Sequence, residues 1–108
     1  MTTPRLRQDG WRAEFPEGIS ADAACLDGHF PGDPIVPGAV LLALAARELA
    51  NEGLKVAKLR RMKFHQPLSP DRALAISFEI AGVRARVTWL DGEDVLARAQ
   101  LTLSTNDH

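Results

Sequence analysis

An almost uncharged helix places the strongest constraint on the fold of this chain. Residues 39–50, AVLLALAARELA, contain only two charged side chains, Arg47 and Glu48. Pro37 and Gly38 suit a helix start, because proline lacks the amide hydrogen that the first turn leaves unbonded, and Gly53 suits a helix end. A helix that is apolar on nearly every face must be covered on nearly every face. The sequence therefore predicts a sheet wrapped around this helix, or a sheet together with a partner subunit.

Segments of alternating polarity supply that sheet. Residues 11–15 are typical of a short strand, and residues 56–68, 73–80, 83–90 and 94–103 are typical of about four more. The apolar positions of three of these segments are expected to face inward: Trp11, Ala13, Phe15; Leu74, Ile76, Phe78, Ile80; Val83, Ala85, Val87, Trp89. The last segment is expected to turn inward Val95, Ala97, Ala99, Leu101 and Leu103. Asp91 and Gly92 predict a hairpin turn. The fold class is α+β, with one long buried helix in the concavity of a curved antiparallel sheet.

Length and composition indicate an ordinary small domain. The 108 residues are expected to form one domain over residues 1–108, with residues 1–10 poorly ordered. A net charge of −1 gives no electrostatic reason to expect nucleic acid or an anionic membrane as partner. The single cysteine, Cys25, cannot form an intrachain disulfide, and no Cys/His spacing typical of a metal site is present.

The sequence also carries no sign of export or membrane insertion. Its N-terminus lacks the apolar stretch of a signal peptide. No apolar run reaches the roughly 20 residues that a membrane span needs. We therefore expect a cytoplasmic protein with no membrane span, no metal and no cofactor.

Two motifs lie close to the start and beyond the end of the helix. The first, GHFPGDPIVPGAVLL at residues 28–42, is rich in proline and glycine, and the second, KFHQPLSPD at residues 63–71, contains two prolines. The first resembles the signature of the hot-dog-fold 3-hydroxyacyl-acyl-carrier-protein dehydratases of fatty-acid synthesis, and the second resembles their later Phe-x-x-Pro-hydrophobic-x-Pro stretch. The compact length is closer to the small dehydratase-like proteins of aryl-polyene and xanthomonadin pigment clusters. The resemblance covers about residues 11–103 and implies a hot-dog fold.

The resemblance also implies a site in which a histidine and a carboxylate meet across a dimer interface. His29 matches the histidine, a residue type whose ordinary pKa lies close enough to neutral pH for proton transfer. Gly38 matches the residue whose backbone amide polarises the thioester carbonyl. The family carboxylate lies fourteen positions after the histidine, where this chain has Ala43, and Arg47 stands where many members carry glutamine. Losing one acid/base partner typically lowers the rate about 10²–10⁴-fold. The implied acyl-binding residues are Phe30, Ile35, Pro37, Ala39, Leu42 and Ala43.

Three other side chains are candidates for the missing acid. Glu48 lies five helical positions after Ala43, about 140° away around the helix, so it cannot simply replace the carboxylate. His65 alternates with Phe64, which favours an exposed position. Asp33 is an alternative acid within the motif, although a turn residue is its commoner role.

A basic stretch after the helix has two interpretations. Lys58, Arg60, Arg61 and Lys63, with Lys55 before them, are typical of a solvated strand face. In a dehydratase-like protein they also suit docking of an acidic acyl carrier protein, and Arg84 and Arg86 extend the cluster. Docking by charge predicts a strong dependence on salt.

Three hypotheses for the function follow. The first is a slow carrier-protein-dependent dehydratase of fatty-acid or polyene biosynthesis, with an acyl thioester as substrate. The second is a non-catalytic or half-catalytic acyl-binding subunit, since a hot-dog partner with its own carboxylate would complete the site containing His29. The third is a hot-dog thioesterase, which usually needs a carboxylate or a positioned water on the helix. The apolar helix favours a dimer in each case, either a homodimer or a hot-dog heterodimer.

Overall fold

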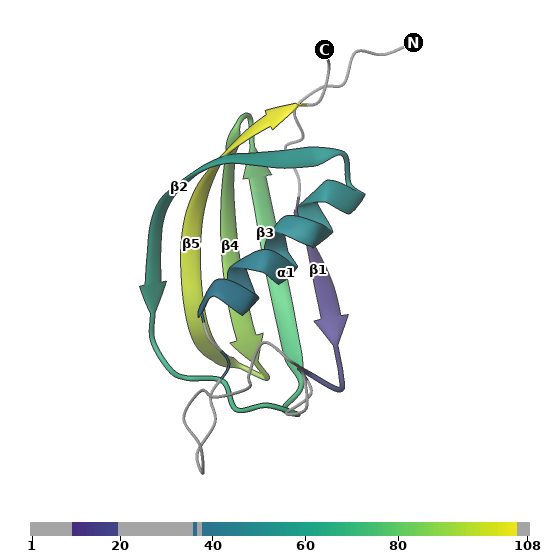
Figure 1. Cartoon of the computed structure of the whole chain (residues 1–108), viewed down its shortest axis with the longest axis vertical. Coiled ribbons are helices and arrows are strands. Elements are labelled where there is room, and N and C mark those ends of the chain that lie inside the picture. The colour runs from purple at the N-terminus through teal and green to yellow at the C-terminus, as the bar shows by residue number, and fades with distance from the viewer. Residues whose placement is uncertain (1–9, 20–35, 37, 106–108) are drawn as a thin grey trace.

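The computed structural model describes residues 10–19, 36 and 38–105, which contain one helix and five strands (Figure 1). β1 (Gly10–Phe15) comes before α1 (Gly38–Asn51) in the chain. Four strands follow the helix: β2 (Leu54–Phe64), β3 (Leu74–Ala81), β4 (Arg84–Asp91) and β5 (Asp94–Thr105). Every pairing is antiparallel, and the strand order is β1-β3-β4-β5-β2. The sheet curves around α1 (Figure 1), as the sequence predicted.

The helix packs on the sheet through one apolar stripe. Leu41, Ala45 and Leu49 recur every four residues and are 3%, 0% and 0% exposed, respectively. The indole Nε1–H of Trp89 on β4 donates a buried hydrogen bond of 2.9 Å to the carbonyl oxygen of Leu41. A buried Trp needs a partner for this donor, so the bond also fixes where the helix crosses the sheet.

β1 joins the sheet at the edge opposite β2. It pairs with β3, and Trp11 lies directly opposite Phe78. The two rings stack with centroids 4.7 Å apart and an interplanar angle of 12°. Trp11, Ala13 and Phe15 all pack against the core from one side of the strand, as their alternation predicted.

The β3–β4 hairpin and the β4–β5 hairpin each turn on a glycine. Ala81 pairs with Arg84 and Asp91 with Asp94, so each loop has two residues. Gly82 and Gly92 occupy the first loop position with φ of 61° and 64°, a conformation that glycine adopts without a Cβ clash. Val83 takes the second position of its loop and is 42% exposed, so its predicted inward orientation is wrong. The hairpin predicted at Asp91 and Gly92 is confirmed.

A bulge in β5 shifts the inward face near its start. Trp89 pairs with Ala97 but Leu90 pairs with Val95, which leaves Leu96 as the extra residue. Leu96 is 2% exposed, whereas Val95, predicted to face inward, is only half-buried. The Leu96 carbonyl oxygen accepts the amides of His65 and Gln66 at 2.7 and 3.1 Å. The bulge therefore anchors the chain immediately after β2 ends.

Candidate functional site

The candidate site begins at the N-terminus of α1, whose first residue is Gly38. The first amides of a helix have no partner within the helix, and they carry the positive end of its dipole. The first turn of α1 contains no acidic residue, so no carboxylate of that turn neutralises this end. Such a terminus favours an oxygen that gains negative charge, which is the role predicted for Gly38.

Phe64, the last residue of β2, lies against Gly38. A Cβ built on Gly38 would come within 2.8 Å of Phe64 Cε1 and closer still to Cζ. The ring nevertheless remains 56% exposed. Gly38 thus has a packing role that the sequence did not predict: its missing side chain makes room for an aromatic ring beside the helix start. The position of Phe64 in the second motif was the available signal.

The two motifs meet a few residues further from the helix. The amide of Val36 donates a 2.8 Å hydrogen bond to the carbonyl oxygen of Leu68. Both side chains are buried, Val36 at 5% and Leu68 at 2% exposure. Stretches that are about thirty residues apart in the sequence are therefore joined at the helix start. His29, Phe30, Ile35 and Pro37, and the alternative acid Asp33, lie outside the described residues.

The helix face that carries Ala43 is open in the single chain. Ala39, Ala43, Arg47 and Ala50 are exposed, and Leu42 beside them is half-buried. Ala39 and Ala43 are one turn apart and form an apolar strip, which Arg47 continues one turn further along the same face. The helix is therefore not covered on every face by its own sheet, and a partner that covers this strip stays a prediction.

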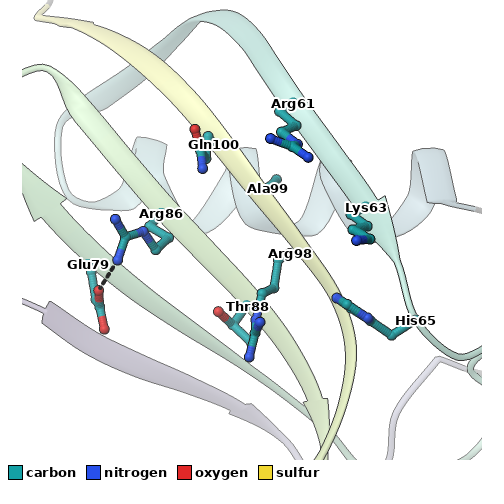
Figure 2. A pocket seen from close by; sticks show the side chains of 9 residues that line it. All are labelled: Arg61, Lys63, His65, Glu79, Arg86, Thr88, Arg98, Ala99 and Gln100. Atoms are coloured by element: carbon teal, nitrogen blue, oxygen red, sulfur yellow. Dashed lines mark ion pairs between the residues drawn. The ribbon is translucent and has the colours of Figure 1, made fainter.

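The predicted basic stretch divides between two environments in β2. Lys58, Arg61 and Lys63 pair with Thr102, Gln100 and Arg98 of β5, whereas Arg60 is skipped by the register. Arg61, Lys63 and His65 line a trough of about 490 Å³ on the sheet face turned away from α1 (Figure 2). His65 is exposed, as predicted. The other residues that line the trough are Glu79, Arg86, Thr88, Arg98, Ala99 and Gln100.

The next two observations, on membranes and on metals, concern residues 10–19, 36 and 38–105. In this part of the chain no helix is both long and apolar enough to cross a membrane. In the same residues, no group of three or more His, Cys, Asp or Glu side chains is placed to hold a metal ion.

The long helix, the sheet curved around it and the strand order together define the hot-dog fold. The two motifs joined at the helix start resemble those of the hot-dog-fold dehydratases. Residues 5–97 match the model of the ApeI-like family, described as ApeI dehydratase. The chain belongs to the ApeI-like family.

Individual relatives agree with this assignment. A 3-hydroxyacyl-[acyl-carrier-protein] dehydratase FabZ from Pelotomaculum thermopropionicum is 28% identical over 109 residues, covering 87% of this chain and 78% of that protein. FabZ from Erythrobacter litoralis is 31% identical over 72% of this chain, which spans only 60% of its relative's length.

Solved structures share the fold at lower identity. The dehydratase heterocomplex ApeI:P from Xenorhabdus doucetiae has a TM-score of 0.66 and 17% identity, covering 90% of this chain and 88% of that one. A point mutant of the fluoroacetyl-CoA-specific thioesterase FlK has a TM-score of 0.60 and 14% identity, with 97% and 91% covered. At such identities the likeness shows the fold alone, so the fold does not separate dehydratases from thioesterases.

Proposed function

We propose that this chain binds an acyl thioester at the N-terminus of α1 and acts as a slow 3-hydroxyacyl-acyl-carrier-protein dehydratase of fatty-acid or polyene biosynthesis. The observation that carries the proposal is the join of the two dehydratase motifs around Gly38, in a chain of the ApeI-like family. In this proposal the protein is cytoplasmic and needs no cofactor. The acyl chain of the substrate lies along the strip of Ala39 and Ala43, with Leu42 beside it.

The proposed reaction removes a proton from C2 of the 3-hydroxyacyl thioester and hydroxide from C3, and its net products are water and the 2-enoyl thioester. The helix amide at Gly38 stabilises negative charge on the thioester oxygen while the C2–H bond breaks. His29 takes up the C2 proton, and solvent supplies the proton that converts the leaving hydroxide to water. Ala43 supplies no acid for the leaving hydroxyl, and the absence of one acid catalyst lowers the expected rate about 10²–10⁴-fold.

The test is mass-spectrometric turnover of a 3-hydroxyacyl carrier protein at high enzyme loading, in both the dehydration and hydration directions. We expect slow formation of the 2-enoyl product by the wild type and none by His29→Ala. Equal product from the two proteins, at a rate above the enzyme-free control, would contradict the assigned role of His29. Absence of product from both would remove the dehydratase proposal for the chain acting alone.

Ala43 favours a second candidate, a subunit of a hot-dog heterodimer. Its side chain lies on the open strip of α1, where a partner would meet the helix. A partner that brings its own carboxylate would complete the site containing His29, while Ala43 would leave the reciprocal site without an acid. Native mass spectrometry with hot-dog proteins of the same genome tests this arrangement. A stable homodimer that exchanges with none of them would count against it.

Thioester hydrolysis is the least supported alternative. It is consistent with the FlK-like fold and with a helix N-terminal amide, but this helix offers no carboxylate at position 43. Release of free acid from the same carrier-bound substrate, without the enoyl product, would favour hydrolysis.

A further inference from the structure

The open strip of α1 carries one charged side chain. Ala39, Ala43 and Arg47 follow one another at every fourth residue, and all three are exposed. Arg47 is the only Lys or Arg among the 14 residues of the helix. It lies away from the buried stripe of the helix, so packing on the sheet does not account for it. A single cation on an otherwise apolar strip needs a separate explanation.

Two common structural roles of a helical arginine do not fit Arg47. An arginine often pairs with a carboxylate three or four residues away, but the positions at those distances are Ala43, Leu44, Ala50 and Asn51. In the part of the chain that the structure describes, Arg47 makes no ion pair. A cation also stabilises the last turn of a helix, yet that turn of α1 contains no basic residue. The guanidinium of Arg47 is therefore available to bind a ligand.

The helix directs the side chain of Arg47 towards position 43. Cα–Cβ bonds tilt towards the helix N-terminus, and a long side chain covers the turn before its own Cα. Ala43 and Arg47 are one turn apart, about 6 Å along the helix axis, which an extended arginine side chain spans. Ala43 carries only a methyl group, so its side chain leaves that place empty. The guanidinium of Arg47 is thus expected over the position where the family pattern has its carboxylate.

This position adjoins the reacting end of the substrate. Ala43 follows Gly38 by five residues, about 7–8 Å along the axis, and Arg47 reaches back over Ala43 towards the helix start. When the thioester oxygen is at the Gly38 amide, C3 is only two carbons away from the thioester carbonyl carbon. We infer that Arg47 is a further catalytic residue, which donates hydrogen bonds to the leaving hydroxyl group on C3. This inference rests on the proposed function.

Arg47 acts by charge instead of by proton transfer. Arginine keeps its proton in proteins, and its guanidinium offers five N–H donors. As His29 removes the C2 proton, the electrons of the C2–H bond form the C2–C3 double bond, and those of the C3–O bond leave with hydroxide. Hydrogen bonds from the guanidinium stabilise this negative charge. Solvent then protonates the hydroxide, and His29 returns its proton to solvent.

The test uses a 3-hydroxyacyl-pantetheine thioester, so that recognition of a carrier protein does not enter the rate. Arg47→Ala should lower kcat about 10²-fold and leave KM almost unchanged, because a donor to a developing charge typically contributes this much. Arg47→Lys keeps the positive charge and should retain part of the activity. Arg12→Ala is the matched control, since Arg12 is an exposed arginine of β1 that pairs with Glu14 at 2.8 Å. It should change kcat by less than about twofold.

Chemical rescue separates catalysis from packing. Guanidinium ion, added to Arg47→Ala at a concentration well below the unfolding transition, should restore part of the rate. Urea has nearly the same shape without the charge and should restore none at the same concentration. Because Arg47 is exposed and makes no ion pair in the described part, Arg47→Ala should unfold at the same urea concentration as the wild type.

Ala43→Glu gives an independent test of the same position. The new carboxylate would lie four residues before Arg47, where the two groups form an ion pair, and it would supply the missing acid. In that background Arg47→Ala should lower kcat by less than about threefold, compared with about 10²-fold in the wild type. Equal losses in the two backgrounds would contradict a shared role at the leaving hydroxyl.

The outcomes separate this inference from the proposed function. If the wild type forms the enoyl product and Arg47→Ala forms it equally fast, only the inference is overturned. Equal rescue by urea and guanidinium would also overturn it, as would rescue by neither solute together with an inactive Arg47→Lys. If the wild type forms no product from the carrier-bound or the pantetheine substrate, the proposed function fails and the role of Arg47 fails with it.

Discussion

The amide of Val36 and the carbonyl oxygen of Leu68 join the two motifs of this protein through a buried 2.8 Å hydrogen bond. One motif leads into α1 and the other leaves β2, so the bond fixes the helix start against the end of the strand. Phe64 reaches Gly38 from the same segment. The geometry of the candidate site therefore depends on a few contacts around residues 64–68.

Leu68→Ala should destabilise the protein by about 2–4 kcal/mol, because it empties a buried position beside this hydrogen bond. Leu59→Ala is the matched control, since Leu59 is 43% exposed, and it should cost less than about 1 kcal/mol. Urea unfolding followed by circular dichroism measures both changes. Similar losses for the two variants would show that Leu68 has no special role at the helix start.

Gly38 and Phe64 should be energetically coupled. Gly38→Ala places a methyl group against the Phe64 ring, and we expect a loss of about 1 kcal/mol, at the low end for overpacking, because the half-exposed ring can swing outward. In a Phe64→Ala background the same change should cost nothing. A double-mutant cycle of unfolding free energies should give a coupling of about 1 kcal/mol. Additive effects within about 0.3 kcal/mol would mean that the ring does not restrict position 38.

Trp89→Phe should lower stability by about 2–3 kcal/mol. The variant loses the Nε1–H bond to the Leu41 carbonyl oxygen, worth about 1 kcal/mol, and leaves a small cavity at a fully buried position. A loss below about 0.5 kcal/mol in urea unfolding would show that the bond contributes little to helix placement.

The sequence was sufficient for the main elements because their patterns are local. The apolar helix, the alternating strands and the glycine hairpin at Gly92 each depend on neighbouring residues, and all of them are confirmed. The bulges at Ala57, Arg60 and Leu96 depend on how two strands pair, which no single segment encodes. For this reason the predicted inward orientation of Val95 was wrong. For the same reason the sequence alone did not indicate that Lys58, Arg61 and Lys63 lie on one face of the sheet.

The candidate site was predictable only in part. Gly38 and Ala43 followed from the family pattern, and the structure describes where both lie. The contact between Gly38 and Phe64 spans 26 sequence positions and needs the folded chain. The exposure of Ala39 and Ala43 likewise follows only from how the helix packs on the sheet. From its composition alone, nearly every face of α1 was expected to be buried.

The central claim is that this chain holds a dehydratase site that lacks its carboxylate at position 43. The most direct test is the turnover of a 3-hydroxyacyl carrier protein by the wild type, Ala43→Glu and His29→Ala/Ala43→Glu, followed by mass spectrometry. Position 43 is exposed on the helix, so glutamate should be accepted without loss of the fold. We predict that Ala43→Glu raises the rate at least about 10²-fold, and that the added His29→Ala abolishes the gain. An unchanged rate in a folded Ala43→Glu protein, or a gain that survives His29→Ala, would contradict the account.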